Sequence, residues 1–228
     1  EQAGLTVSGF EFGFAAFTDR TDPARAWTAV RGSAARAAAL GIPGVTLAAE
    51  DLVIEINRAA ADGSLIDFAA APFDVSVGAG GKTVRFEMAA ASGELIRASG
   101  DLAVGVAGFF HLEGGFAVEK SRGSLLVADG NEVAVDLLTL GAVGVNAFAG
   151  LNGGTASAAG VSLNDVELAL ALMTDRADTS RKWVALEASA ASVGFGGITG
   201  LSVQSSDLNV SINQAAGVVS YIDNANAN

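Results

Sequence analysis

Apolar residues alternate with polar or small residues along most of the chain, with a period of two. The alternation changes parity in mid-pattern: residues 45–47 follow one parity and residues 52–56 the other, and the same switch occurs within residues 5–14 and 201–212. A shift of one residue turns the following side chains to the opposite face of a sheet, so each switch predicts a corner or a bulge. We expect each such unit to form two short strands around a bend.

The opening stretch of the chain is repeated without a gap near its end. The partner of Gly4 is Gly160, and this offset of 156 residues holds to residue 227. About 27 of roughly 68 paired positions are identical, well above chance, which is typical of a tandem repeat. Residues 4–159 are predicted to form one full repeat and residues 160–228 the first part of the next. The retained pairs include turn formers and large anchors: Glu11/Glu167, Asp19/Asp175, Arg20/Arg176, Asp22/Asp178, Arg25/Arg181, Trp27/Trp183, Asp51/Asp207, Asn57/Asn213 and Asp67/Asp223.

Comparison of the two copies decides the secondary structure of an ambiguous segment. Taken alone, residues 24–40 are typical of an Ala-rich helix. The partner copy contains Val and Gly within residues 181–197 at positions that disfavour a helix, so both copies are predicted to be strands. Hairpin loops are expected at residues 18–23 and 174–180, and further hairpins join Val75–Val77 to Val84–Met88 and Phe116–Val118 to Leu125–Val127. The whole chain is therefore predicted to be all-β.

The content of small residues bears on how the strands are arranged. Many inward positions are Ala or Gly, which allows sheets to approach closely, and abundant Gly favours tight corners. These features predict a tandem-repeat protein built as an elongated stack or solenoid-like array of β-sheets. The alternative is a string of β-sandwich modules. The joint at residues 152–160 has no long flexible linker, which favours the continuous array, although its glycines allow a short hinge.

Charge and composition exclude several classes of partner. The net charge is -12, with 25 acidic residues against 13 basic ones that are scattered singly, so nucleic acid and anionic lipid surfaces are not expected partners. The absence of cysteine excludes disulfides and thiolate chemistry. The longest charge-free run, residues 137–164, contains too many Asn, Ser, Thr and Gly residues to predict a membrane span.

No motif predicts catalysis. Residues 76–83 come within one position of a phosphate-binding loop, but the alternation that follows predicts a strand instead of the required helix, so a Gly-rich hairpin turn is expected there. His111 is the single histidine and lies among Phe and Leu residues, which is typical of a packed strand edge. No spacing selects a pair of carboxylates for acid–base chemistry. The chain is therefore not expected to be an enzyme.

The acidic corners are the best candidate site. Each copy places two carboxylates in one loop, and hard oxygen ligands suit Ca²⁺ in an extracellular setting. The candidate ligands are Asp19, Asp22, Asp175 and Asp178. The arginines of the same loops offer a competing interpretation, in which surface ion pairs satisfy these carboxylates. No other cofactor is expected.

The repeated units also carry a resemblance. The G-h-x-h-x-x-x-D-L-x-h-x-h units (h, apolar) and the T-D-R-x-D corners at residues 18–22 and 174–178, each followed by Trp, resemble the repeat modules of very large, repetitive bacterial secreted proteins. The resemblance covers residues 4–71 and 160–227 and, more loosely, residues 95–120. It implies a cell-surface or matrix location, a longer parent protein and no enzymatic activity in the repeat.

Two functional hypotheses follow. The first is a structural module of an extracellular bacterial surface fibre, stalk or adhesin, whose partners are neighbouring repeats of the same chain or identical chains. The second is an extracellular carbohydrate- or surface-binding module that acts by avidity on a partner such as a surface polysaccharide. In the second hypothesis Trp27 and Trp183 serve as stacking platforms, whereas in the first they are packing anchors in the core.

Overall fold

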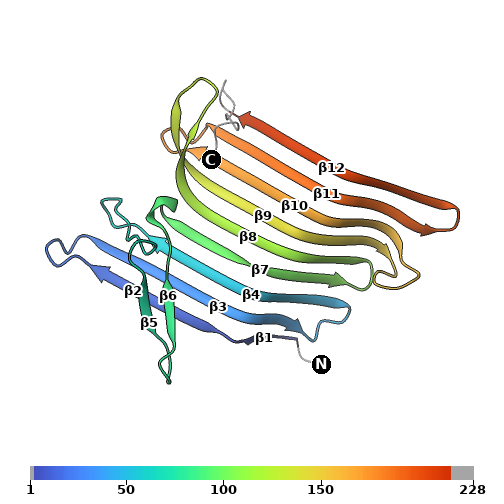
Figure 1. The fold of residues 1–228 in the computed structure, drawn as a ribbon, viewed down its shortest axis with the longest axis horizontal. Helices are drawn as coiled ribbons and strands as arrows, with labels where there is room; N and C mark the ends of the chain where they lie inside the picture. The colour runs from blue at the N-terminus through green and yellow to red at the C-terminus, as the bar shows by residue number, and fades with distance from the viewer. Residues whose placement is uncertain (1–2, 217–228) are drawn as a thin grey trace.

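A computed structural model describes residues 3–216 of the chain, and within them it is all-β, as predicted. The only element that is not a strand is a 3-10 turn at Ala90–Ser92. The strands are β1 (Gly4–Ser8), β2 (Glu11–Thr18), β3 (Ala26–Leu40), β4 (Val45–Arg58), β5 (Phe73–Ser76), β6 (Thr83–Phe86), β7 (Leu95–Val106), β8 (Phe110–Leu126), β9 (Glu132–Leu151), β10 (Ala159–Asp175), β11 (Lys182–Ile198) and β12 (Leu201–Ala216) (Figure 1).

One large antiparallel sheet contains all strands except β5 and β6. Its order is β1-β3-β4-β7-β8-β9-β10-β11-β12, and β2 also pairs with β3. Since β1 pairs with residues 36–40 of β3 and β2 with residues 26–33, β1 and β2 lie end to end along the same edge. Figure 1 shows the resulting meander, in which long antiparallel strands lie side by side. Strands β5 and β6 form a separate hairpin.

The parity switches of the sequence correspond to residues with left-handed backbone. Asp51 in β4 has φ 49°, and the pairing with β7 shifts register there, which confirms the predicted bulge. Asp165 in β10 has φ 50°, and the pairing with β9 also shifts register there. Asp207 of β12 has φ 55° at the matching position. The prediction of two separate strands per unit holds only for β1 and β2, which are divided at Gly9. It is wrong for β4, β10 and β12, because pairing resumes within the same strand beyond Asp51, Asp165 and Asp207.

Two further segments test the strand assignments. The Ala-rich segment is a strand, β3, as its comparison with the second copy predicts. The hairpin expected between Phe116–Val118 and Leu125–Val127 is wrong, because residues 110–126 form the single strand β8. This strand pairs with β7 up to Lys120 and with β9 up to Leu126. Pairing with β9 keeps residues 120–123 extended, where their local composition is typical of a turn.

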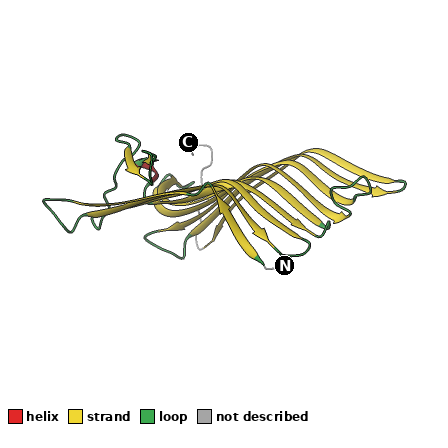
Figure 2. Cartoon of the chain, turned by 90° about the horizontal axis from the view of Figure 1, so that it is seen from below, coloured by secondary structure: helices red, strands yellow, loops and turns green. Residues whose placement is uncertain are grey.

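The buried side chains form two clusters at one end of the sheet. The first lies under the β5–β6 hairpin, which packs on β2 and β3, and contains Ala15, Ala29, Phe68, Phe86, Met88 and Leu95. The second lies where β8, β9, β10 and β11 end and contains Val127, Val133, Val135, Met173 and Trp183. Figure 2 shows the sheet as a single layer over most of its width, with the hairpin segment raised on one side. Most of the sheet therefore has no covering layer among residues 3–216.

Candidate functional site

The two acidic corners have the same backbone. The first joins β2 to β3 and the second joins β10 to β11. Asp19 N donates a hydrogen bond to Arg25 O at 2.9 Å, and Asp175 N donates to Arg181 O at 3.1 Å. Each corner is thus closed by the same hairpin bond at the same sequence spacing.

The first aspartate of each corner holds its own turn with one carboxylate oxygen. Asp19 Oδ1 accepts from the backbone amide of Thr21 at 2.8 Å and from its hydroxyl at 2.7 Å. Asp175 Oδ1 accepts from the amide of Ala177 at 2.7 Å. The hydrogen bond from the Thr21 amide, followed by that from its hydroxyl, lowers the pKa of Asp19 below its ordinary value. These contacts are Asx turns, in which the side chain replaces a backbone acceptor.

The second aspartate of each corner repeats this arrangement further along the loop. Asp22 Oδ1 accepts from the amide of Ala24 at 3.1 Å. Asp178 Oδ1 accepts from the Ser180 amide at 3.1 Å and from the Ser180 hydroxyl at 2.7 Å. The Ser180 hydroxyl, and then its amide, lower the pKa of Asp178. All four candidate carboxylates therefore accept hydrogen bonds from their own loops.

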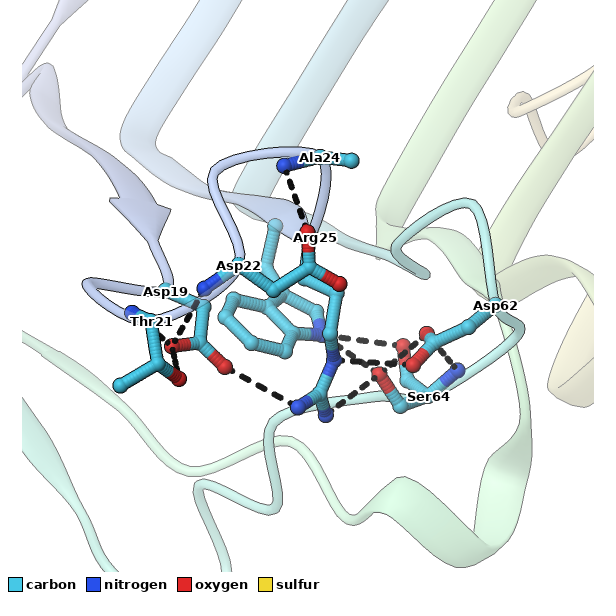
Figure 3. A network of polar contacts seen from close by, with 8 residues as sticks. Asp19, Thr21, Asp22, Ala24, Arg25, Asp62 and Ser64 are labelled. Carbon is cyan, nitrogen blue, oxygen red and sulfur yellow. Dashed lines mark hydrogen bonds and ion pairs between the residues drawn. The ribbon is translucent and has the colours of Figure 1, made fainter.

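An arginine forms an ion pair with the other carboxylate oxygen of the first aspartate in each corner. Arg25 Nη1 lies 3.0 Å from Asp19 Oδ2, and Arg181 Nη1 lies 3.0 Å from Asp175 Oδ2. In the first corner Arg25 Nε also lies 2.8 Å from Asp62 Oδ2 (Figure 3). The ion-pair interpretation of the loop arginines is confirmed for Arg25 and Arg181.

Each arginine in turn covers a tryptophan ring. The guanidinium carbon of Arg25 lies 5.2 Å from the centre of the Trp27 ring, and that of Arg181 lies 5.4 Å from the Trp183 ring. Trp27 is half-buried and its Nε1 donates to Ser64 O at 3.0 Å. Trp183 is 1% exposed, which confirms it as a packing anchor and leaves it no face for a sugar.

The structure brings the predicted calcium ligands together in pairs only. Asp19 and Asp22 share one loop, and Asp175 and Asp178 share another, and the four strands β4, β7, β8 and β9 separate the two loops in the sheet. Within residues 3–216 no group of three or more acidic or histidine side chains is placed to hold a metal ion. Ca²⁺ takes six to eight oxygen ligands, and here one oxygen of each pair already faces a guanidinium. This donor set fits a structural corner, and calcium binding stays a prediction.

The other residues that we considered for catalysis lie in a hairpin turn and on an exposed part of a strand. Residues 76–83 turn the β5–β6 hairpin, with Val77 N donating to Lys82 O at 2.8 Å, as predicted. His111 Nε2 lies 3.3 Å from Glu113 Oε2 on an exposed part of β8. Neither arrangement joins a nucleophile to a base.

A cross-strand ladder of charges was not predicted from the sequence. Arg97 Nη1 lies 3.3 Å from Glu55 Oε2 and its Nη2 lies 2.7 Å from Glu119 Oε2, and Arg31 Nε lies 3.7 Å from Glu55 Oε1. Partial burial opposes the charge of Arg97, but the Glu119 and Glu55 contacts outweigh it and raise the pKa of Arg97. The ladder crosses β3, β4, β7 and β8, so only the strand register brings its members together.

Comparison with protein-family models, with curated proteins and with solved structures found no match to this chain. The resemblance to bacterial surface repeat modules therefore depends on the pattern of residues in the sequence alone. Among residues 3–216, no helix has the length and apolar character needed to cross a membrane.

Proposed function

We propose that the chain is a structural repeat module of an extracellular bacterial surface fibre, stalk or adhesin, which provides length and a repetitive β scaffold without catalysis. The observation that carries this proposal is the position of the two sequence copies in one sheet. The first copy contains β1, β2, β3 and β4, and the second contains β10, β11 and β12. The same corner, arginine and tryptophan recur in both, with the same contacts.

The joint between the two periods supports a continuous sheet. Strand β9 ends one 156-residue period and β10 begins the next, and the two pair from Ala159↔Leu151 to Asp175↔Val135. A backbone ladder of this length is as extensive as those inside the period, such as the one between β8 and β9. Periods joined in this way would advance as one sheet, whereas a string of sandwich modules would have a linker at this place.

The match between strands of the two copies indicates which strands would pair with the two edges of the sheet. Strand β10, which matches β1 and β2, pairs with β9; strand β4, which matches β12, pairs with β7. The outer edge of β1 and β2 is thus suited to a β9-like strand, and the outer edge of β12 to a β7-like strand. An open edge carries unpaired N–H and C=O groups that bind another strand. Neighbouring repeats of the same chain, or identical chains, are the partners that supply such strands.

Electron microscopy of a chain with three or more 156-residue periods tests the proposal. One period occupies six strand tracks, namely β1 with β2, β3, β4, β7, β8 and β9. At about 4.8 Å between strands, each period should advance the particle by roughly 29 Å along the sheet. A ribbon or rod with this constant advance, in calcium and in chelator alike, is the expected result. Separate globules on a flexible string would contradict the proposal and favour sandwich modules.

A further inference from the structure

The two faces of the large sheet differ in chemistry. Residues paired directly across antiparallel strands point to the same face, so the register defines rows that cross the sheet. The row through Ala98 contains only apolar residues and glycine over the full width: Phe12, Gly32, Ile54, Ala98, Val118, Leu140, Leu170, Leu186 and Ile212. We call the face that bears this row the apolar face.

The apolar face continues on the far side of the bulges at Asp51 and Asp165. Strand β7 keeps a constant register with β8 and contains no residue with left-handed backbone, and an even number of positions separates Ala98 from Val106, so both lie on the same face. The row through Val106 is again apolar: Val45, Val106, Phe110, Ala149, Val161, Phe195 and Val203. The apolar face thus extends over both halves of the sheet.

The opposite face carries the charges and the hairpin. The row through Arg97 on this face contains Arg31, Glu55, Arg97, Glu119 and Thr139. Hairpin β5–β6 also packs here, because a Cβ on Gly13 would lie 3.0 Å from Val84 side-chain atoms. On the apolar face, a charged side chain stands at the end near the corners, where Lys120 is in register with Ile96 and Leu138. An apolar centre with charge at its margin is the usual anatomy of a protein interface.

The apolar face is uncovered among the described residues. Phe12 is 48% exposed, Ile54 50% and Val118 44%, although each is a large apolar side chain. Contiguous patches of this kind are rare on monomers and mark interaction surfaces. The solvent-accessible area is 13504 Å², whereas a compact monomer of 22.7 kDa has about 9,500 Å². The difference, roughly 4,000 Å², exceeds what each chain of an obligate dimer buries.

We infer that the apolar face is the docking surface for a second copy of this chain, packed face to face as a two-layer β-sandwich. From Phe12 to Val118 small residues alternate with large ones along the row, as Gly32 does between Phe12 and Ile54, and this relief suits interdigitation of two sheets about 10 Å apart. The charges of the Arg97 row then point outward in both copies, and Lys120 stays at the margin of the interface. A net charge of -12 disfavours an anionic lipid surface as the occupant. The inference concerns pairing across faces and does not depend on the fibre proposal, which concerns pairing along edges.

Two adjacent residues of β8 provide a matched test. Val118 and Ala117 are both exposed and lie on opposite faces, since Val118 is in the apolar row and Ala117 pairs with Ser99 and Gly141. Val118→Lys places a charge in the centre of the proposed interface, and Ala117→Lys places the same charge on the other face. Sedimentation equilibrium of the chain and both variants measures the dissociation constant, at low and at moderate salt.

The expected result is a dimer of twice 22.7 kDa for the unmodified chain and for Ala117→Lys. Val118→Lys should raise the dissociation constant at least about 100-fold, because one lysine in each copy is then buried without a partner. Since the chain has no cysteine, labelling provides a second readout: a thiol reagent should react more slowly with Val118→Cys than with Ala117→Cys in the dimer.

Three outcomes overturn the inference. One is a monomer at tens of micromolar, and another is equal weakening by the two lysine variants. The third is a dimer that Val118→Lys leaves intact while the amides of β12 become protected from hydrogen exchange, which indicates edge pairing. A monomer that floats with phosphatidylcholine vesicles would identify lipid as the occupant instead. None of these results changes the advance per period that tests the fibre proposal.

Discussion

The two corners offer the same ion pair in two environments, and neutralising the aspartate should therefore have unequal effects. Asp175 is 3% exposed, and its partner Arg181 has a side chain that is 29% exposed. The Asp19 side chain is 20% exposed, and its partner Arg25 has a second acidic neighbour in Asp62. We expect Asp175→Asn to destabilise the protein markedly and Asp19→Asn to have a smaller effect.

The expected magnitude follows from what the substitution removes. Asn keeps the Oδ1 acceptor that holds the amide of Ala177, so the turn remains closed. It removes the charge that faces Arg181, and a buried hydrogen bond to a charged group contributes about 1.5–3 kcal/mol. We therefore expect Asp175→Asn to lower the free energy of unfolding by about 2 kcal/mol, which at a typical urea slope of about 2 kcal/mol/M lowers the midpoint by about 1 M.

Urea unfolding followed by tryptophan fluorescence measures this difference. Trp27→Phe in both variants leaves Trp183 as the reporter, and circular dichroism in the same samples shows whether the whole sheet unfolds together. In Asp19→Asn, Arg25 keeps its contact with Asp62, and solvent screens the remaining charge. Equal midpoint shifts in the two variants, or a larger shift for Asp19→Asn, would refute the reasoning that burial decides the contribution.

Three further predictions concern the hairpin, the corner and the bulge. Phe86→Ala should lower the free energy of unfolding by about 3–5 kcal/mol because Phe86 is 0% exposed, whereas Phe10→Ala, at 66% exposure, should change the melting temperature little. Ser180→Ala should raise the pKa of Asp178 toward its ordinary 3.8, as measured by carboxyl NMR. Because the folded pKa is lowered, the ionised Asp178 stabilises the protein above pH 3.8, and this contribution is lost as the pH falls through the folded pKa; the variant should lose less stability on acidification. Asp51→Val should cost about 1–2 kcal/mol in urea unfolding, since a β-branched residue at φ 49° is strained, and Asp51→Gly should be tolerated.

The sequence pattern was sufficient to assign secondary structure where the two copies of the repeat could be compared. The composition of residues 24–40 alone favours a helix, and only the second copy, with Val and Gly at matching positions, indicates the strand that β3 forms. The bulge at Asp51 was visible as a change of parity. The continuity of β8 was not, because residues 120–123 are held extended by pairing with β9, and pairing between strands is a property of the whole sheet.

The candidate site shows the same limit. The sequence places Asp19 with Arg25 and Asp175 with Arg181 in their loops, and the structure pairs them. It does not reveal that only Asp175 is buried, because the cluster beside it includes residues of the β8–β9 hairpin, far away in the chain. Burial at a repeated corner depends on which neighbours the fold brings to each copy.

Edges and faces of the sheet imply two directions of association with different physical signatures. Edge pairing replaces water at backbone N–H and C=O groups, depends little on side chains, and extends the sheet in the direction from β1 to β12. Face pairing depends on apolar side chains such as Ile54 and Val118, and added salt should strengthen it by screening the repulsion between two chains of charge -12. A lysine on the apolar face therefore distinguishes the two modes of association. It should abolish face pairing and leave the advance per period, which depends on edge pairing, unchanged. If both modes operate, the assembly is a ribbon two sheets thick, with its charged faces exposed on both sides.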